Sequence, residues 1–155
     1  MFKERMRVEP TPERVYALCC LVAKSTMSKD RLRQMLEPDW LERRPSNFGL
    51  TYRAARELDL VSEIDENVRL NVSKALQDFS HFRRFAAHQV FKDPNSLFFR
   101  YTAWYLNQND QYFYYTNVDE MAMKLGSEFD RDKVDDIALR GWRFWASFLG
   151  EGVLH

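Results

Sequence analysis

A stretch of alternating polarity near the middle of the chain limits what its first half can fold into. Residues 60–64 and 68–72 lie on either side of the polar sequence Asp65-Glu66-Asn67, and every second residue in both segments is apolar apart from Ser62. Such alternation around a short polar turn is typical of a β-hairpin. We therefore expect a small hairpin at the end of a segment that is otherwise helical in pattern.

Three short helices are predicted before this hairpin, beginning near residues 12, 29 and 47. Each has apolar residues three and four positions apart, which places them on one face of a helix. Side chains suited to capping or stopping a helix mark the boundaries. These boundary residues are Thr11, Ser28, Pro38, and Ser46 or Asn47.

Three helices followed by a small hairpin resemble the winged helix-turn-helix family. The phrase ARELDLVSEIDENVRLNV, residues 55–72, is similar to the junction between recognition helix and wing in that family. The resemblance covers residues 11–73. It implies a domain that most often binds double-stranded DNA, with its third helix in the major groove.

Residues 74–155 hold most of the aromatic side chains and form the second predicted domain. Helices are predicted at 74–91, 97–106, 117–125 and about 130–149, with Gly126 and Gly150 ending the last two. The order from residue 97 onward resembles that of residues 12–72. This indicates a second, truncated winged-helix-like unit without its hairpin, and a plain helical bundle is the alternative. The fold class expected for the whole chain is mainly α.

A tandem arrangement of this kind resembles the DpdG-type component of deazapurine DNA-modification clusters. The resemblance implies a DNA-recognition subunit of a bacterial DNA-modification or antiviral defence system. Transcription regulators are the other class of protein that the winged helix implies.

The candidate DNA contacts come from the connector before the third helix, from that helix, and from the hairpin. Arginine in the middle of a recognition helix can form paired hydrogen bonds with guanine, so Arg53 and Arg56 are predicted base readers, together with Tyr52. Hydroxyl and amide groups at the start of the helix can bind phosphate. The full set of predicted contacts is Arg43, Arg44, Ser46, Asn47, Thr51, Tyr52, Arg53, Arg56, Asn67 and Arg69. A solvated helix face with an ion pair between Arg53 and Glu57 is the alternative.

The charge balance favours a second function. Lys plus Arg and Asp plus Glu both total 23, whereas proteins that depend on phosphate attraction are usually basic. Acidic residues also surround the proposed site: Glu57, Asp59, Glu63, Asp65 and Glu66. A winged-helix adaptor that binds other proteins in a larger complex is therefore the alternative to DNA binding.

The last predicted helix carries large aromatic residues in nearly every direction, so it is expected to be buried on several sides. We predict that Trp142, Trp145 and Phe148 form an interface in a homo-oligomer or with another protein subunit, with a hydrophobic core as the alternative. Stacking of nucleobases on the interleaved Phe and Tyr side chains of the second half, with Arg83, Arg84 and Arg100, is a further interpretation.

No enzyme signature, cofactor or metal site is predicted. His81 and His88 lie about 10 Å apart along one helix face, too far to share a metal ion. The acidic residues Asp130, Asp132, Asp135 and Asp136 are interpreted as a helix cap. The neighbouring cysteines Cys19 and Cys20 are typical of reduced thiols in a cytoplasmic protein, and no apolar stretch is long enough to span a membrane.

Overall fold

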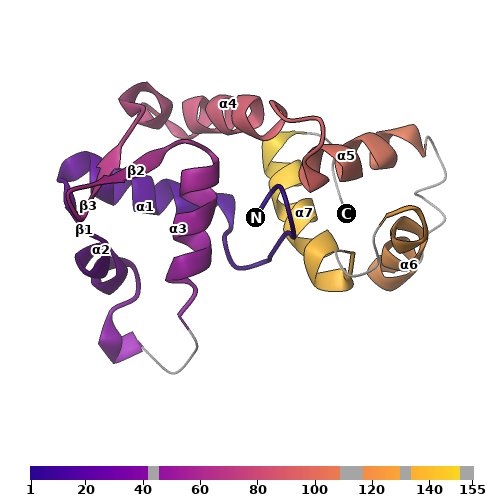
Figure 1. Ribbon diagram of the computed structural model, residues 1–155, viewed down its shortest axis with the longest axis horizontal. Helices are drawn as coiled ribbons and strands as arrows, with labels where there is room; N and C mark the ends of the chain where they lie inside the picture. The colour runs from indigo at the N-terminus through magenta and orange to yellow at the C-terminus, as the bar shows by residue number, and fades with distance from the viewer. Residues whose placement is uncertain (42–45, 109–116, 130–133, 151–155) are drawn as a thin grey trace. The chain divides into compact units, whose positions relative to one another are not determined.

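The computed structural model describes residues 1–41, 46–108, 117–129 and 134–150 (Figure 1). These residues are mainly helical and include one small antiparallel sheet. The chain divides into two compact units. The N-terminal unit is Glu9–Gln89, and the C-terminal unit combines Met1–Val8 with Val90–His155. The division thus differs from the expected boundary after residue 73, because the helix that follows belongs with the N-terminal unit and the first eight residues do not.

The N-terminal unit contains the three helices and the hairpin predicted for it. In chain order its elements are α1 (Pro12–Lys24), β1 (Met27–Ser28), α2 (Lys29–Leu36), η1 (Asp39–Leu41), α3 (Phe48–Glu57), β2 (Val61–Ile64), β3 (Asn67–Leu70), η2 (Ser73–Leu76) and α4 (Phe79–Val90). The predicted caps are confirmed: the Thr11 and Ser28 hydroxyls accept hydrogen bonds from backbone N–H groups in the first turns of α1 and α2. The single helix expected over 74–91 is instead the short η2 followed by α4.

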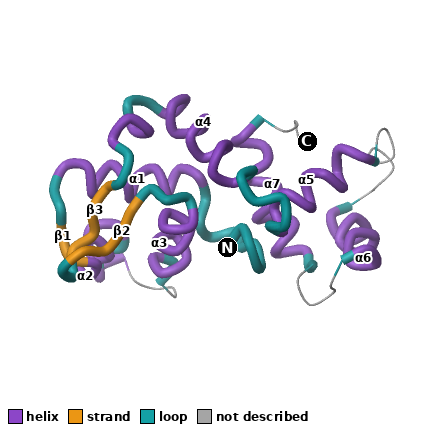
Figure 2. The backbone as a smooth tube through the Cα atoms, turned by 45° about the horizontal axis from the view of Figure 1, so that its top comes forward, coloured by secondary structure: helices purple, strands orange, loops and turns teal. Residues whose placement is uncertain are grey.

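The sheet has the strand order β1-β3-β2, and both pairings are antiparallel (Figure 2). The sequence analysis did not include β1, which has only two residues and therefore shows no alternation. Val61 and Val68 are buried, and β3 packs against α1. Leu18 and Leu32 are also fully buried, so helices and sheet share one core. Burial in this core raises the pKa of the Cys19 thiol to about 12, which keeps it protonated.

A left-handed residue joins α3 to the hairpin. Asp59 has φ of +56°, and the N–H groups of Asp59 and Leu60 donate to the carbonyls of Arg56 and Ala55, which closes the end of the helix. The Asn71 side-chain amide donates to the backbone carbonyl and the carboxylate of Asp59, both at 3.2 Å. These bonds fix the direction in which β2 leaves α3.

The hairpin turn consists of Asp65 and Glu66, with φ of +49° and +64°. Two-residue turns with both φ values positive match the twist of paired strands, but they favour asparagine or glycine over glutamate. We expect Glu66→Gly to raise the free energy of unfolding by about 0.5–1 kcal/mol. Chemical denaturation would measure this change. Arg69→Gly provides the control: in the extended strand β3 a glycine should lower stability, and a loss at both positions would contradict the left-handed turn.

The C-terminal unit contains α5 (Leu97–Asn107), α6 (Val118–Glu128) and α7 (Asp136–Leu149). Ser96 and Asn117 cap α5 and α6, and Gly150 ends α7, as predicted, with φ of +89°. The prediction that Gly126 ends α6 was wrong, because the helix continues to Glu128. In the described part of the chain, no helix is both long and apolar enough to cross a membrane.

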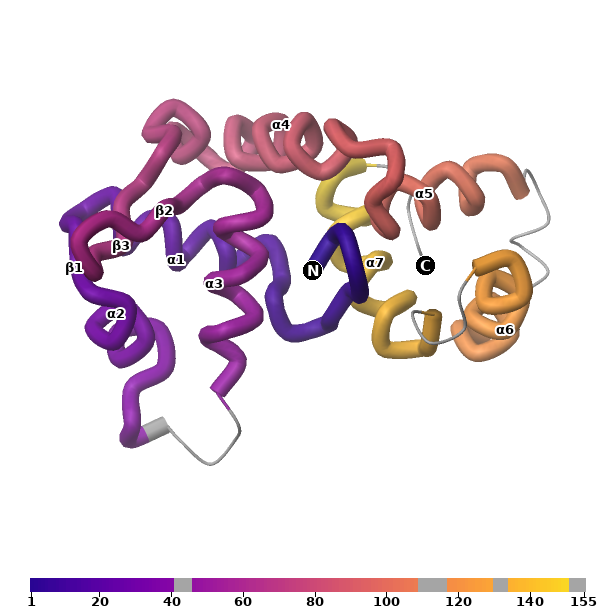
Figure 3. Tube along the Cα trace, viewed as in Figure 1, coloured from indigo at the N-terminus to yellow at the C-terminus, as the bar shows by residue number. Residues whose placement is uncertain are grey.

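The first eight residues are part of the core of the C-terminal unit (Figure 3). Met1, Phe2 and Met6 are at most 5% exposed. The Phe2 carbonyl accepts a hydrogen bond of 3.1 Å from the Phe98 N–H. The Phe2 ring packs edge-on against the rings of Phe98 and Trp145. The segment therefore ties α5 to α7, although the sequence analysis assigned it no structural role.

Candidate nucleic-acid interface

An exposed stripe of residues runs along α3 and faces an open hollow of about 670 Å³. Gly49, Arg53 and Arg56 are exposed, and their spacing of four and three residues places them on one side of the helix. Lys29, at the start of α2, also lines the hollow. Within the described residues neither Arg53 nor Arg56 forms an ion pair, so the alternative pairing of Arg53 with Glu57 is not present. The two guanidinium groups are thus open to an anionic partner.

Tyr52 is a residue of α3 that contacts both β2 and Lys29. The sequence analysis placed Tyr52 on the outer face of α3, but its side chain is only 4% exposed, so that placement was wrong. Its hydroxyl donates a hydrogen bond of 3.1 Å to the Glu63 carboxylate on β2, and the Lys29 ammonium lies 4.8 Å from the centre of its ring. Burial and the bond to Glu63 raise the pKa of Tyr52. Tyr52 therefore joins α3 to the sheet and positions Lys29.

The start of α3 is already occupied by a carboxylate. Glu37 accepts hydrogen bonds from the Ser46 hydroxyl at 2.5 Å and from the Asn47 N–H at 3.0 Å. Thr51, expected on the outer face, is instead 4% exposed and donates to the Asn47 carbonyl. Thr51 is therefore not on the outer face of α3. Ser46 and Asn47 could bind a phosphate only through groups that do not already bond to Glu37. Sequence spacing did not reveal this contact, because Glu37 follows α2 and Ser46 precedes α3, nine residues apart in the chain.

The hairpin presents a mixed surface. Arg69 is exposed and lies opposite Ser62, on the same face of the sheet as Asn67, while the core face carries Val61 and Val68. The Asn67 side chain donates a hydrogen bond of 2.9 Å to the Asp65 carbonyl and so supports the turn. Arg69 is available on the outer face, but the turn beside it is acidic.

Further basic residues lie on α2 and in the connector between α2 and α3. The predicted contacts Arg43 and Arg44 lie outside the described residues. On α2, Arg31 is exposed, and Arg33 lies 3.7 Å from the Asp39 carboxylate.

The aromatic residues predicted at an interface are mostly inside the C-terminal unit. Trp142 and Trp145 are 2% and 1% exposed, so their side chains form the core of this unit and not a subunit interface. The Trp142 indole N–H donates to the Thr102 hydroxyl at 3.0 Å, and the Tyr105 ring lies beside it. Phe148 is half-buried against Trp145. The alternative expectation, a hydrophobic core, describes the two tryptophans.

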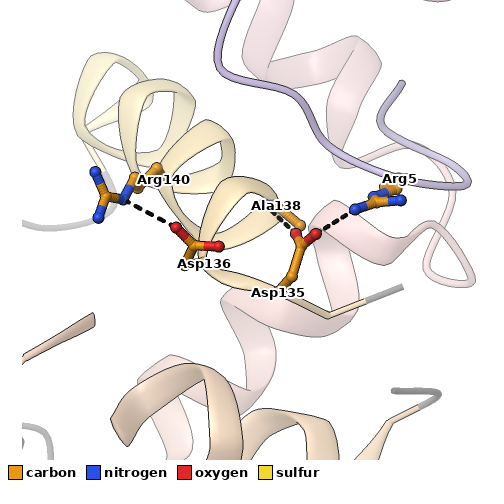
Figure 4. A network of polar contacts seen from close by, with 5 residues as sticks. All are labelled: Arg5, Asp135, Asp136, Ala138 and Arg140. Carbon is orange, nitrogen blue, oxygen red and sulfur yellow. Dashed lines mark hydrogen bonds and ion pairs between the residues drawn. The ribbon is translucent and has the colours of Figure 1, made fainter. Parts of the chain in front are cut away.

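Of the four aspartates predicted to cap the last helix, Asp135 caps α7 and Asp136 is the first residue of the helix. Asp135 accepts a hydrogen bond from the Ala138 N–H and pairs with Arg5, and Asp136 lies 3.7 Å from the Arg140 guanidinium (Figure 4). Asp130 and Asp132 lie outside the described residues. Among the residues that the structure describes, no three His, Cys, Asp or Glu side chains are placed to hold a metal ion.

A comparison with known protein families shows the family of this chain. A family model described as DpdG-like matches residues 6–152, which include nearly all of both units. The chain belongs to the DpdG-like family. Membership in the DpdG-like family points to a component of a DNA-modification system, in agreement with the resemblance stated from the sequence. Comparisons with curated proteins and with solved structures gave no match.

Proposed function

We propose that the N-terminal unit is a winged helix-turn-helix module that binds double-stranded DNA, and that the chain is a non-catalytic DNA-recognition component of a DNA-modification system. The observation that carries the proposal is the exposed pair Arg53 and Arg56 on α3, with Lys29 across the same hollow. The succession α1, α2, α3 and hairpin supports the fold assignment, and the DpdG-like family supports the biological context.

The geometry of α3 suits reading in the major groove. Arg53 and Arg56 are separated by about 4.5 Å along the helix axis. That distance is close to the rise of about 3.4 Å between neighbouring bases of a strand. Each guanidinium can donate two parallel hydrogen bonds to a guanine. Arg69 on the outer face of the hairpin, with Arg43 and Arg44, supplies the proposed phosphate contacts.

The acidic residues of the module restrict where the DNA backbone lies. Asp65 and Glu66 at the hairpin turn and Glu37 at the start of α3 repel phosphate. The proposed binding surface is therefore the exposed stripe of α3, Gly49, Arg53 and Arg56, together with the Lys29 side of the hollow. Because so few cations face the DNA, the affinity should depend on base contacts more than on non-specific attraction.

Fluorescence anisotropy of a labelled duplex at two salt concentrations tests the proposal. We expect weak binding to random DNA at low salt, with a shallow salt dependence because few cations face phosphate, and tighter binding to a selected site. Arg53→Ala and Arg56→Ala should each weaken binding to a selected site by about 1–3 kcal/mol and relax its sequence preference. Lys24→Ala, which removes an exposed cation from the end of α1, serves as the matched control and should change affinity little.

Two results would contradict the proposal. The first is an absence of binding at low salt, which would favour the alternative of a protein–protein adaptor. The second is an equal effect of all three substitutions, which would show that only total charge matters. The adaptor alternative lacks the apolar patch expected around Trp142 and Trp145, because both are buried.

A further inference from the structure

Gly49 is a residue for which the fold itself gives no reason. It lies in the first turn of α3, is exposed, and would meet no atom within 4 Å if it carried a Cβ. Gly141 and Gly150, by contrast, have internal reasons: Gly141 touches the backbone of Arg7, and Gly150 has positive φ. A glycine within a helix lowers stability relative to alanine.

The surroundings of Gly49 indicate what could approach it. Gly49 lies on the same stripe as Arg53 and Arg56, and Lys29 lines the hollow beside it. Among the described residues that line this hollow, Lys29, Arg53 and Arg56 are cations and Glu57 is acidic. Glu37 bonds to Ser46, another lining residue. The missing Cβ leaves the helix backbone exposed in this hollow. Glycine serves this purpose where a backbone must come close to a ligand.

We infer that Gly49 is the point of closest approach between α3 and bound DNA, and that its missing side chain lets the helix enter the groove deeply enough for Arg53 and Arg56 to reach base edges. The inference rests on the proposed function and adds a steric determinant to it. Gly49 itself makes no directional contact. It acts by positioning the two arginines.

The test uses two substitutions at Gly49 in the full chain. Gly49→Ala should raise the unfolding temperature by a few degrees, because alanine favours the helix. The same substitution should weaken DNA binding about tenfold, and Gly49→Gln should weaken it further while leaving the chain folded. A loss of affinity combined with a gain in stability cannot result from unfolding. The sequence preference should also relax, since the arginines no longer reach the bases.

Ala17→Gln on α1 is the matched control, because it enlarges an exposed helical side chain in the same unit outside the hollow. Its affinity for DNA should equal that of the unaltered chain. If the unaltered chain binds DNA and both Gly49 variants bind equally well, the inference is overturned and the proposed function stands. If the unaltered chain binds no DNA at low salt, both are overturned.

Discussion

Replacing Trp145 with alanine is expected to destabilise the C-terminal unit by about 3–5 kcal/mol, the range for truncating a large buried aromatic side chain. The Trp145 indole is 1% exposed. It packs edge-on against the rings of Phe2 and Phe148, with centroids 4.9 and 5.9 Å away. Its removal would leave a cavity between α7 and the N-terminal segment. Such a loss is comparable to the whole stability of many small domains.

Amide hydrogen exchange followed by mass spectrometry would measure this effect locally. Peptides from α5 and α7 should lose protection in Trp145→Ala. Phe144→Ala is the matched control, because Phe144 precedes Trp145 on the same helix but is 51% exposed. Its effect should stay within about 0.5 kcal/mol. A variant that kept its protection but sedimented as a smaller species would contradict the core assignment and restore the interface prediction.

The elements that sequence reasoning predicted correctly have local causes. Thr11, Ser28 and Ser96 each accept a hydrogen bond from a backbone N–H three residues further on, so their effect is visible in a short stretch of sequence. The hairpin could be predicted because an alternation of polar and apolar residues is visible within a strand of only a few residues. Both kinds of signal need no knowledge of distant parts of the chain.

The features that were missed depend on residues far apart in sequence. Tyr52 and Thr51 were placed outward because helical periodicity alone cannot show that a second face of α3 is covered. Tyr52 bonds to Glu63 on β2, and this contact accounts for its burial. Glu37 reaches the start of α3 across the connector. Of the site, the exposed arginines could be predicted from spacing, whereas the groups that surround them required the tertiary structure.

The role of the first eight residues was also invisible locally. The segment is mostly charged, and its buried apolar residues are too few to show a helical or strand periodicity. These residues are Met1, Phe2 and Met6. Its partners are Phe98 and Trp145, which lie about a hundred residues or more away in the chain. Gly141 is a more direct sequence signal of this contact, because a glycine in the middle of an aromatic-rich helix indicates that another backbone lies close by.

The substitution Gly141→Ala should therefore have a large effect that is specific to the N-terminal segment. A Cβ on Gly141 would lie 2.5 Å from the Arg7 carbonyl oxygen and 2.7 Å from its carbonyl carbon. The neighbouring atoms are backbone, so they cannot move aside as a flexible side chain could. We expect a loss of about 1–3 kcal/mol, the usual result of overpacking, or release of residues 1–8 from α7.

Limited trypsin digestion distinguishes these outcomes, because Lys3, Arg5 and Arg7 lie in the segment. Faster cleavage at these sites would show release, and a lower unfolding temperature with unchanged cleavage would show strain in place. Gly49→Ala provides the comparison within one chain: the same added methyl group meets open space there and should stabilise the protein. If Gly141→Ala were also stabilising, the N-terminal segment could not pack against α7. If Gly141→Ala destabilises the protein and Gly49→Ala stabilises it, then Gly141 is retained for its contact with the N-terminal segment. Gly49 would then have to be explained by contact with another molecule.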